Sequence, residues 1–321
     1  MKLTEKRSKR GAFRTALFLV TAVALFSVAL LVGGTKVEAN HPVLVEGNCD
    51  SPVPGTTLVA PGTCGDFDGD GRIGTAEDTD GADRIFGTLK AALGPGTGAA
   101  AGTGANFNGK IIIVTSGRFA ESLFIGNSGY VAGEGTPAPG NLTIEAAPGV
   151  NADIDAIFQG DPAGGNVGRT TATGIAIVYT GSDRVVTLRN LQLRNWATAI
   201  GTFLNSRVHI DHCRLEGNIG YGIRIADNSR VVVTNSQIDS SGFRTGVGSS
   251  TPAPGIGISV EGTAQARLAF TNISHSAASG IHNATAATAN VNVYKVSLYF
   301  NTPNASGNGF AAAPNDNFVA E

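Results

Sequence analysis

The sequence predicts an all-β solenoid, a parallel β-helix with about 23 residues per coil and a short capping helix at its N-terminal end. Its first support is a strand–turn–strand unit with alternating apolar residues, which occurs five times between residues 186 and 300. The predicted turn residues are 22, 23, 37 and 23 positions apart: Asn190, His212, Asn235, Asn272 and Lys295. Its second support is a set of isoleucines 23, 35 and 23 positions apart: Ile200, Ile223, Ile258 and Ile281. No helical stripe accompanies this period, which is also too short for a propeller blade.

Both sets of spacings place one insertion of roughly 14 residues in the same coil. The extra residues fall at 243–255, where Ser-Ser-Thr-Pro-Ala-Pro-Gly is typical of a loop. A single coil cannot bury its apolar face, but stacked coils about 4.8 Å apart close a continuous core. We therefore expect regular coils from residue 174 onward and looser spacing before it.

These units resemble the right-handed parallel β-helix superfamily, the pectate-lyase-like fold, over roughly residues 110–310. The resemblance implies an internal ladder of asparagine amides along the stack, to which Asn190, Asn235 and Asn272 would contribute. Residues His212 and Lys295 depart from that ladder and would interrupt it. Enzymes of this superfamily act on acidic polysaccharides along an exposed strand face, yet the resemblance implies a fold far more than an activity.

The first 39 residues have the composition of a secretory signal peptide. Six basic residues precede an apolar segment at 16–32, and the small-residue site Val37-Glu-Ala39 follows it. We expect cleavage after Ala39 and a secreted or surface-attached mature chain of 282 residues (321 − 39) without a membrane span. A retained membrane anchor is the alternative, although the apolar segment is at the short end for a span.

Removal of the signal segment leaves 16 basic and 23 acidic residues (23 − 7 and 25 − 2), a net charge of −7. Phosphate binding requires a basic face, so we do not expect nucleic acid as a partner. We expect a monomer whose partner is a polysaccharide or a cell surface. The predicted organisation is a signal peptide at 1–39, a cap at 40–94, the β-helix at 95–310 and a C-terminal tail at 311–321.

The sharpest chemical motif is an acidic loop from Asp66 to Glu77, which satisfies every position of D-x-[DN]-x-[DN]-G-x5-E. Calcium takes about six to eight oxygen ligands. The carboxylates of Asp66, Asp68 and Asp70, the backbone carbonyl of Arg72 and a bidentate Glu77 would supply them. The loop resembles a single EF-hand or dockerin-type Ca²⁺ loop, although only one copy is present and little room remains for an entering helix. A solvated acidic turn is the alternative.

Two of the three cysteines, Cys49 and Cys64, lie close together in a Pro/Gly-rich segment, and we expect them to form a disulfide in an oxidising compartment. A metal-ligand role for this pair is the alternative. We expect Cys213 to be a small buried side chain rather than a catalytic thiol, and Trp196 to pack under the next coil rather than stack on a sugar. Residues 83–93 are predicted to form a short helix, and our hypothesis is that the calcium loop and the disulfide fix it as the N-terminal cap.

Alternation along the strands predicts which side chains point outward. One predicted outward column contains Arg189, Asp211, Thr234, Thr271 and Tyr294, and the next face contains Gln192, Arg194, Arg214, Glu216, Gln237 and Asp239. The candidate paired carboxylates for glycoside hydrolysis are Asp211, Glu216 and Asp239. The candidates for binding uronate carboxylates are Arg214 and Arg194. An ion-paired surface without catalytic function is the alternative, in which opposite charges in neighbouring coils pair.

Two function classes remain open. The first is an exported, non-catalytic module that binds a glycan or another surface partner, and the second is a polysaccharide lyase or glycoside hydrolase that acts on an acidic polysaccharide. Residues 210–213, Ile-Asp-His-Cys, resemble the Trp-Ile-Asp-His segment of pectate lyases, but His209 stands in place of the tryptophan. The Asp-Asp pair and Gly-His-Gly motif of polygalacturonases are absent from the sequence, as are serine-triad, phosphate-loop and zinc motifs. Whether the protein is an enzyme therefore stays open at this point.

Overall fold

The described residues of this computed structural model are 43–46, 85–93, 109–119, 121–126, 141–155, 173–178, 180, 184–242, 255–285, 290–303, 305–307 and 318–320. The chain divides into two compact units, 1–40 and 41–321, and every described residue lies in the second. The predicted signal peptide, disulfide and calcium loop fall outside the described residues. Within the described ranges, no helix is long and apolar enough to cross a membrane.

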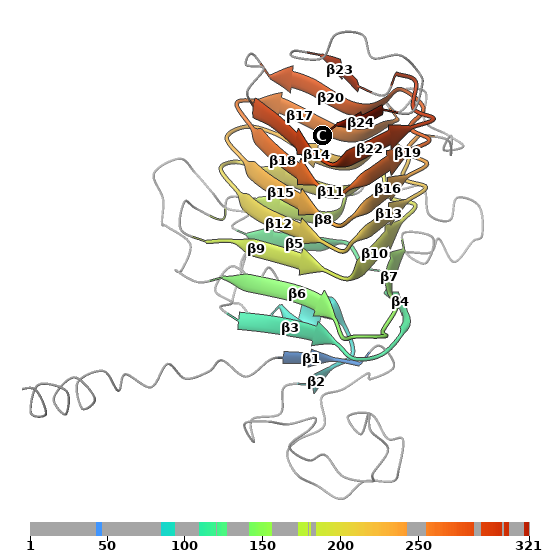
Figure 1. Ribbon diagram of the computed structural model, residues 1–321. Coiled ribbons are helices and arrows are strands. Elements are labelled where there is room, and N and C mark those ends of the chain that lie inside the picture. The colour runs from blue at the N-terminus through green and yellow to red at the C-terminus, as the bar shows by residue number, and fades with distance from the viewer. Residues whose placement is uncertain are drawn as a thin grey trace, which may run out of the picture. The chain divides into compact units, whose positions relative to one another are not determined.

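Three sheets build the described part of the chain, and the chain visits them in turn (Figure 1). Sheet 1 contains, in spatial order, β2 (Ile85–Phe86), β1 (Val43–Val45), β3 (Gly109–Ile113), β6 (Leu142–Ala146), β9 (Val186–Arg189), β12 (Arg207–Asp211), β15 (Arg230–Thr234), β18 (Gln265–Ala269) and β21 (Val291–Tyr294). Sheet 2 contains β4 (Gly117–Phe119), β7 (Ala152–Asp155), β10 (Leu191–Arg194), β13 (Arg214–Glu216), β16 (Gln237–Asp239), β19 (Asn272–Ser274), β22 (Val296–Tyr299) and β24 (Phe318–Ala320). Sheet 3 contains β5 (Leu123–Gly126), β8 (Thr173–Val178), β11 (Thr198–Phe203), β14 (Tyr221–Ile225), β17 (Ile256–Gly262), β20 (Ser279–Thr285) and β23 (Ala305–Gly307).

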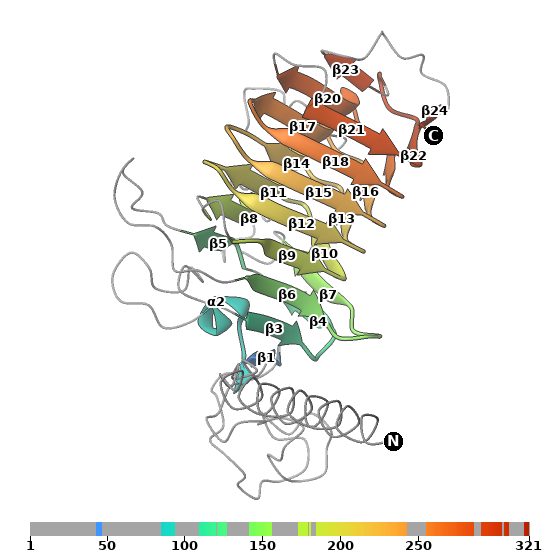
Figure 2. The same cartoon turned by 60° about the vertical axis from the view of Figure 1, so that its left-hand side comes forward.

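From β3 to β23, each strand is hydrogen-bonded to the strand three places along the chain. These neighbours are all parallel, whereas the described end of the chain turns back, because β24 pairs antiparallel with β22. The described strands from β3 to β23 therefore make seven coils of three strands each, stacked in chain order (Figure 2). This arrangement confirms the predicted all-β parallel solenoid.

The inward side chains of successive coils close one aliphatic core. In β9 and β10 the side chains alternate between buried and half-buried, as a sheet with one covered face requires. The four isoleucines of the predicted spacing are register partners in sheet 3 and are fully buried: Ile200, Ile223, Ile258 and Ile281. Burial of each such side chain contributes about 1.5–3 kcal/mol.

Two of the glycines before these isoleucines permit a close approach of neighbouring coils. A Cβ atom at Gly222 would lie 2.6 Å from the carbonyl oxygen of Gly257, and one at Gly257 would lie 2.6 Å from that of Gly280. Real Cβ atoms do not approach an oxygen so closely, so the neighbouring backbone would have to shift. The glycines in this column are therefore required by the stacking of sheet 3.

The turn residues between sheets 1 and 2 adopt the left-handed conformation in five successive coils. They are Asn190 (φ 55°), His212 (51°), Asn235 (50°), Phe270 (52°) and Lys295 (49°). The prediction of Asn272 as the fourth turn residue was wrong, because Asn272 is the first residue of β19 and pairs with Gln237. The buried side chains of Leu268 and Ile273 fix the register in this coil, and a left-handed Phe270 is the consequence.

The same correction moves Thr271 from the outside of the coil to the inside. Its side chain is fully buried, and its hydroxyl donates to the carbonyl oxygen of Ala269 at 3.0 Å. The outward register position between Thr234 and Tyr294 belongs to Ala269. The rest of the predicted column is confirmed, since these residues are register partners in sheet 1: Arg189, Asp211, Thr234 and Tyr294.

Behind the second turn, five successive coils carry a buried column that includes polar side chains. Residues Asn190 and Asn235 are exposed, so the implied internal ladder of asparagines is not formed there. The buried column behind the turn between sheets 2 and 3 consists of Trp196, Asn218, Ser241, Ser276 and Asn301. The side-chain oxygen of Asn218 accepts from the backbone N–H of Trp196 at 3.1 Å. The indole N–H of Trp196 donates to the carbonyl of Ile154 at 2.9 Å, which confirms that this tryptophan packs inside.

The first coils are covered by β1, β2 and a single-turn helix, α2 (Leu89–Ala92). The helix is shorter than the predicted 83–93, because Ile85 and Phe86 form β2 instead. Its side chains Leu89, Ala92 and Leu93 join the core. The backbone N–H groups of Leu89 and Lys90 donate to the carboxylate of Glu121 at 3.0 and 2.9 Å, which satisfies the start of the helix.

Candidate functional site

The outward face of sheet 2 carries three of the four candidate catalytic residues. Residues Arg214, Glu216 and Asp239 point out of β13 and β16, and Glu216 is the register partner of Asp239. The fourth candidate, Asp211, ends β12 and belongs to the face of sheet 1. The structure therefore brings two of the three candidate carboxylates together on one face and separates Asp211 from them by the turn at His212.

The carboxylates on the sheet 2 face are already paired. Glu216 forms an ion pair with Arg214 Nε at 3.3 Å and accepts a hydrogen bond from Gln192 Nε2 at 3.3 Å. Asp239 contacts His275 Nδ1 at 2.9 Å and accepts from the hydroxyl of Ser274 at 2.6 Å. Burial acts to raise the pKa of Asp239, but the hydrogen bonds from Ser274 and His275 lower it overall. These contacts favour the ionised form of the Asp239 carboxyl group.

Arg194 forms the most buried ion-paired cluster of this face. Its guanidinium binds both oxygens of Asp153, with Nε at 3.0 Å from Oδ1, and its Nη2 lies 3.4 Å from Asp155 Oδ2. The hydrogen bond with Asp153 raises the pKa of Arg194 despite the desolvation. Glu216 is the register partner of Arg194, but Arg194 pairs with the two aspartates of the preceding coil instead. On β7, β10 and β13, the outward arginines of sheet 2 are therefore paired with carboxylates of the same face.

Asp211 is the centre of a hydrogen-bond network on sheet 1. Its Oδ1 accepts from Thr234 Oγ1 at 2.7 Å and Asn235 Nδ2 at 3.0 Å, and its Oδ2 accepts from Arg189 Nε at 3.2 Å. His212 Nδ1 lies 3.0 Å from Oδ1. Burial acts to raise the pKa of Asp211, but the hydrogen bonds from these neighbours outweigh burial and hold the pKa well below its ordinary value. The Asp211 carboxylate therefore links β12 to residues of β9 and β15.

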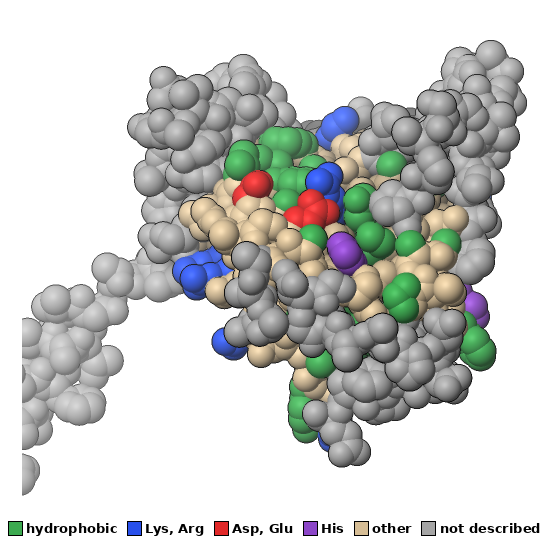
Figure 3. All heavy atoms as spheres, turned by 90° about the horizontal axis from the view of Figure 1, so that it is seen from above, with side chains coloured by type: hydrophobic (Ala, Val, Ile, Leu, Met, Phe, Trp, Pro, Cys, Tyr) green, Lys and Arg blue, Asp and Glu red, His purple; other side chains and the backbone are tan. Residues whose placement is uncertain are grey.

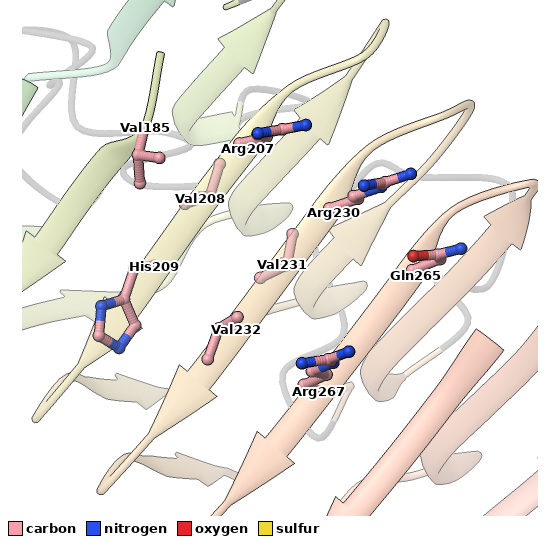
Figure 4. Close-up of a pocket in the computed structure, with 9 residues that line it drawn as sticks. All are labelled: Val185, Arg207, Val208, His209, Arg230, Val231, Val232, Gln265 and Arg267. Carbon is pink, nitrogen blue, oxygen red and sulfur yellow. The ribbon is translucent and has the colours of Figure 1, made fainter. Parts of the chain in front are cut away.

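A groove on the outward face of sheet 1 is the one feature of this face that sequence reasoning missed. Its cavity volume is about 560 Å³. The residues that line it are Val185, Arg207, Val208, His209, Arg230, Val231, Val232, Gln265 and Arg267. They come from β12, β15 and β18 and from the residue before β9, so the groove crosses four successive coils (Figure 4).

The described lining of this groove carries positive charge. It contains Arg207, Arg230 and Arg267, and no Asp or Glu is among its described residues. Arg207 and Arg230 are register partners, so two guanidinium groups of like charge stand next to each other across β12 and β15 (Figure 4). Among the described residues, none of the three arginines forms an ion pair through its side chain. Like charges opposite each other in a sheet destabilise it by about 0.2–1 kcal/mol, so the fold gains nothing from this arrangement.

One histidine of the groove is held in place by the Asp211 network. His209 Nε2 lies 3.0 Å from the hydroxyl of Thr234, which donates to Asp211. The arginine pair could have been found from the sequence, because positions 207 and 230 are 23 residues apart and so share one outward column. The free thiol of Cys213 is not part of any such site, since it is buried and burial raises its pKa to about 12.

No group of three or more His, Cys, Asp or Glu side chains in the described ranges is arranged to hold a metal ion. The predicted ligands Asp66, Asp68, Asp70, Arg72 and Glu77 lie outside the described residues, as do Cys49 and Cys64. The calcium loop and the disulfide therefore stay predictions.

Residues 173–320 match the family described as a right handed beta helix region, and they span the coils from β8 onward. The chain is a right-handed parallel β-helix. The crystal structure of pectate lyase Pel9A is similar to 72% of this chain, with 14% sequence identity and a TM-score of 0.43. The β-helix spans about half the length of that protein, 52% of its chain. No curated protein matches the sequence.

Proposed function

We propose that the protein is an exported, calcium-binding β-helix module that binds an acidic polysaccharide without cleaving it. The observation that carries this proposal is the groove on sheet 1, where Arg207, Arg230 and Arg267 have no acidic neighbour among the described lining residues. Guanidinium groups bind carboxylates and sulfates through paired, charge-assisted hydrogen bonds. A ligand that carries such groups would offset the repulsion between the arginines.

The shape of the groove favours a polymer over a small anion. The lining extends across four coils, and three steps of about 4.8 Å give a length of roughly 14 Å. Between the charged side chains lies Val232, whose side chain is exposed and offers an apolar contact for the C–H groups of a sugar ring. Repeating carboxylates along a polysaccharide would meet one guanidinium after another as the chain crosses the strands.

The absence of a cleaving function is inferred from the groups that surround the groove. The nine described residues of its lining include no carboxylate and no lysine, and His209 is hydrogen-bonded to Thr234. The carboxylates Glu216 and Asp239 lie on the other face and are paired with neighbouring residues. The alternative, a polysaccharide lyase or glycoside hydrolase, would need one of these pairs to open on substrate binding.

Two parts of the proposal rest on the sequence alone. Export is supported by the basic and apolar segments before Ala39. Calcium binding is supported by the 12-residue motif from Asp66 to Glu77, where oxygen ligands recur at the spacing that Ca²⁺ requires. The metal would hold the acidic loop together and has no role in the groove.

The test is binding of the mature chain to polygalacturonate by affinity electrophoresis, with Arg230→Gln and Arg267→Gln as groove variants. Arg214→Gln is the matched control, because it removes the same charge from the other face. We expect each groove variant to weaken binding about tenfold or more, and the wild-type affinity to fall steeply with added salt.

Two results would overturn the proposal. Equal losses in Arg214→Gln and Arg230→Gln would mean that binding does not use the groove. Release of unsaturated products or new reducing ends, abolished by Glu216→Ala, would establish the enzyme alternative and place its site on sheet 2.

A further inference from the structure

The left-handed residues in the turns on either side of sheet 2 are of different types in the last two complete coils. In the earlier coils the left-handed turn residues between sheets 1 and 2 are Asn190, His212 and Asn235, and those between sheets 2 and 3 are Asn195, Gly217 and Ser240. In the last two coils the corresponding residues are Phe270 and Lys295 at the first turn, and His275 and Phe300 at the second. Phenylalanine, lysine and histidine thus stand at corners where the earlier coils have asparagine, glycine, serine and one histidine.

The fold does not require these aromatic residues. A bulky residue at positive φ is strained, whereas Asn and Gly tolerate this conformation. The side chains of Phe270 and Phe300 are 52% and 63% exposed, so little apolar burial offsets the strain. Strained residues that the core does not use are characteristic of binding sites.

The aromatic rings form two platforms. At the second turn, Phe300 stacks on His275, with ring centroids 5.1 Å apart and an interplanar angle of 20°, and Tyr299 meets it edge-on at 5.8 Å. At the first turn, Phe270 and Tyr294 meet edge-on at 5.5 Å. The two platforms therefore bracket the outward face of β19 and β22.

The strip between the platforms is polar. Asn272 is exposed and Ser297 half-buried, and they are register partners on β19 and β22. The nearby charges are Asp239, which is paired with His275, and Lys295, whose Nζ lies 5.7 Å from the Phe270 ring and 5.4 Å from the Tyr294 ring. Seen from the end of the stack, hydrophobic side chains form separate patches among polar atoms (Figure 3).

We propose that the outward face of β19 and β22 is a second binding site, which takes a neutral glycan. Flat apolar rings with amide and hydroxyl groups between them match a pyranose, which has C–H faces and a rim of hydroxyls. The sugar faces stack on Phe300 and Phe270, and Asn272 and Ser297 hydrogen-bond to the hydroxyls. The corners are five residues apart along the chain, or about 16 Å, so both platforms act on one oligosaccharide.

The site is independent of the arginine groove. It lies on sheet 2, at its two turns and at Tyr294, the last residue of β21, whereas the groove lies on β12, β15 and β18 of sheet 1, and the two share no residue. The arginines of the groove select negative charge, whereas the two platforms select the apolar face of a sugar ring. The mature chain then holds two glycans of different charge at once.

The test uses Phe300→Ser and Phe270→Asn in the mature chain, because Ser240 and Asn235 stand at the same two corners in the preceding coils. Both variants are expected to melt at or above the wild-type temperature, since they remove strain. Retardation in affinity gels is measured with three neutral polysaccharides, a β-glucan, a xylan and a mannan. We expect at least one to bind, with a loss of tenfold or more in each variant and retention in Phe300→Tyr.

Three outcomes would overturn the proposal. The first is that none of the three neutral polysaccharides retards the wild-type chain. The second is that Phe300→Ser loses polygalacturonate binding, which would assign the rings to the acidic ligand. The third is a concentration-dependent dimer in sedimentation that Phe300→Ser abolishes, which would make a second copy the occupant. Arg230→Gln must leave neutral-glycan binding unchanged, so failure of the groove and failure of this site are distinguished.

Discussion

Removal of the Asp211 carboxylate tests whether the sheet 1 network stabilises the fold. Asp211 is 8% exposed, and its carboxylate accepts hydrogen bonds from Thr234, Asn235 and Arg189. In Asp211→Ala the hydroxyl of Thr234 and the amide of Asn235 lose their acceptor, and the guanidinium of Arg189 loses one of its two acidic neighbours. We therefore expect the variant to be folded but less stable than the wild type.

The size of the loss follows from the exposure of the donors. The side chains of Arg189 and His212 are 42% and 57% exposed, so solvent screens their pairs with Asp211 to under about 1 kcal/mol each. The hydrogen bonds from Thr234 and Asn235 to a charged acceptor are worth about 1.5–3 kcal/mol each and are not additive. We expect a loss of about 2–3 kcal/mol in the free energy of unfolding, which is roughly 4–10 °C in melting temperature.

The assay is thermal unfolding followed by circular dichroism at pH 7 and about pH 2.5, with Thr187→Ala as the control on the same face. Because the folded pKa of Asp211 is lowered, its contribution is complete above the ordinary aspartate pKa of about 3.9 and is lost as the pH falls toward the folded value. The difference between Asp211→Ala and the wild type should therefore shrink at low pH. An equal difference at both pH values, or no difference at pH 7, would refute the reasoning.

Three further predictions test the stack, the buried thiol and the cap. Gly257→Ala should lower the free energy of unfolding by about 1–3 kcal/mol in denaturant titrations, since its Cβ would lie 2.6 Å from a carbonyl oxygen, whereas Gly117→Ala meets nothing within 4 Å and should be neutral. Cys213 should resist thiol reagents at pH 8 until the chain unfolds, because burial raises its pKa to about 12, and fast labelling of the native protein would contradict this. Chelation of calcium, or Asp70→Ala, should lower the melting temperature and speed hydrogen exchange at residues 111–114, and unchanged exchange there would disprove the proposed role of the loop in the cap.

The coil period could be predicted from the sequence because a β-helix repeats one register. The isoleucines of sheet 3 indicate this period clearly, since one of them fills the same inward position in each of four successive coils. The error at Asn272 arose where a local motif competed with that register: Phe270-Thr-Asn272 resembles the earlier turn segments, and asparagine is the usual left-handed residue. Burial of Ile273 in the core decided the register, and the strain at Phe270 followed.

The pairing of charges could not be predicted in the same way. The register places Arg194 beside Asp155 in the preceding coil and Glu216 in the following coil. The sequence does not determine which of these carboxylates forms the ion pair with Arg194. The structure shows that it turns to Asp155 and its neighbour Asp153, which leaves Glu216 to Arg214 on its own strand. A long, flexible guanidinium reaches several partners at similar distances, so only the packed structure determines the ion pairs.

Once the register of the coils is known, the sequence predicts which charged side chains of the groove are neighbours. In a β-helix, residues one period apart become neighbours about 4.8 Å apart in a column along the stack. Charges in such a column either alternate in sign and attract each other, or have the same sign and repel each other. The column through Arg189 balances, because Glu145 precedes it and Asp211 follows it. The column of Arg207 and Arg230 continues into the neutral Gln265 and does not balance. Both columns lie on the outward face of sheet 1, and the unbalanced column of Arg207 and Arg230 is the one that the proposed anionic ligand would stabilise.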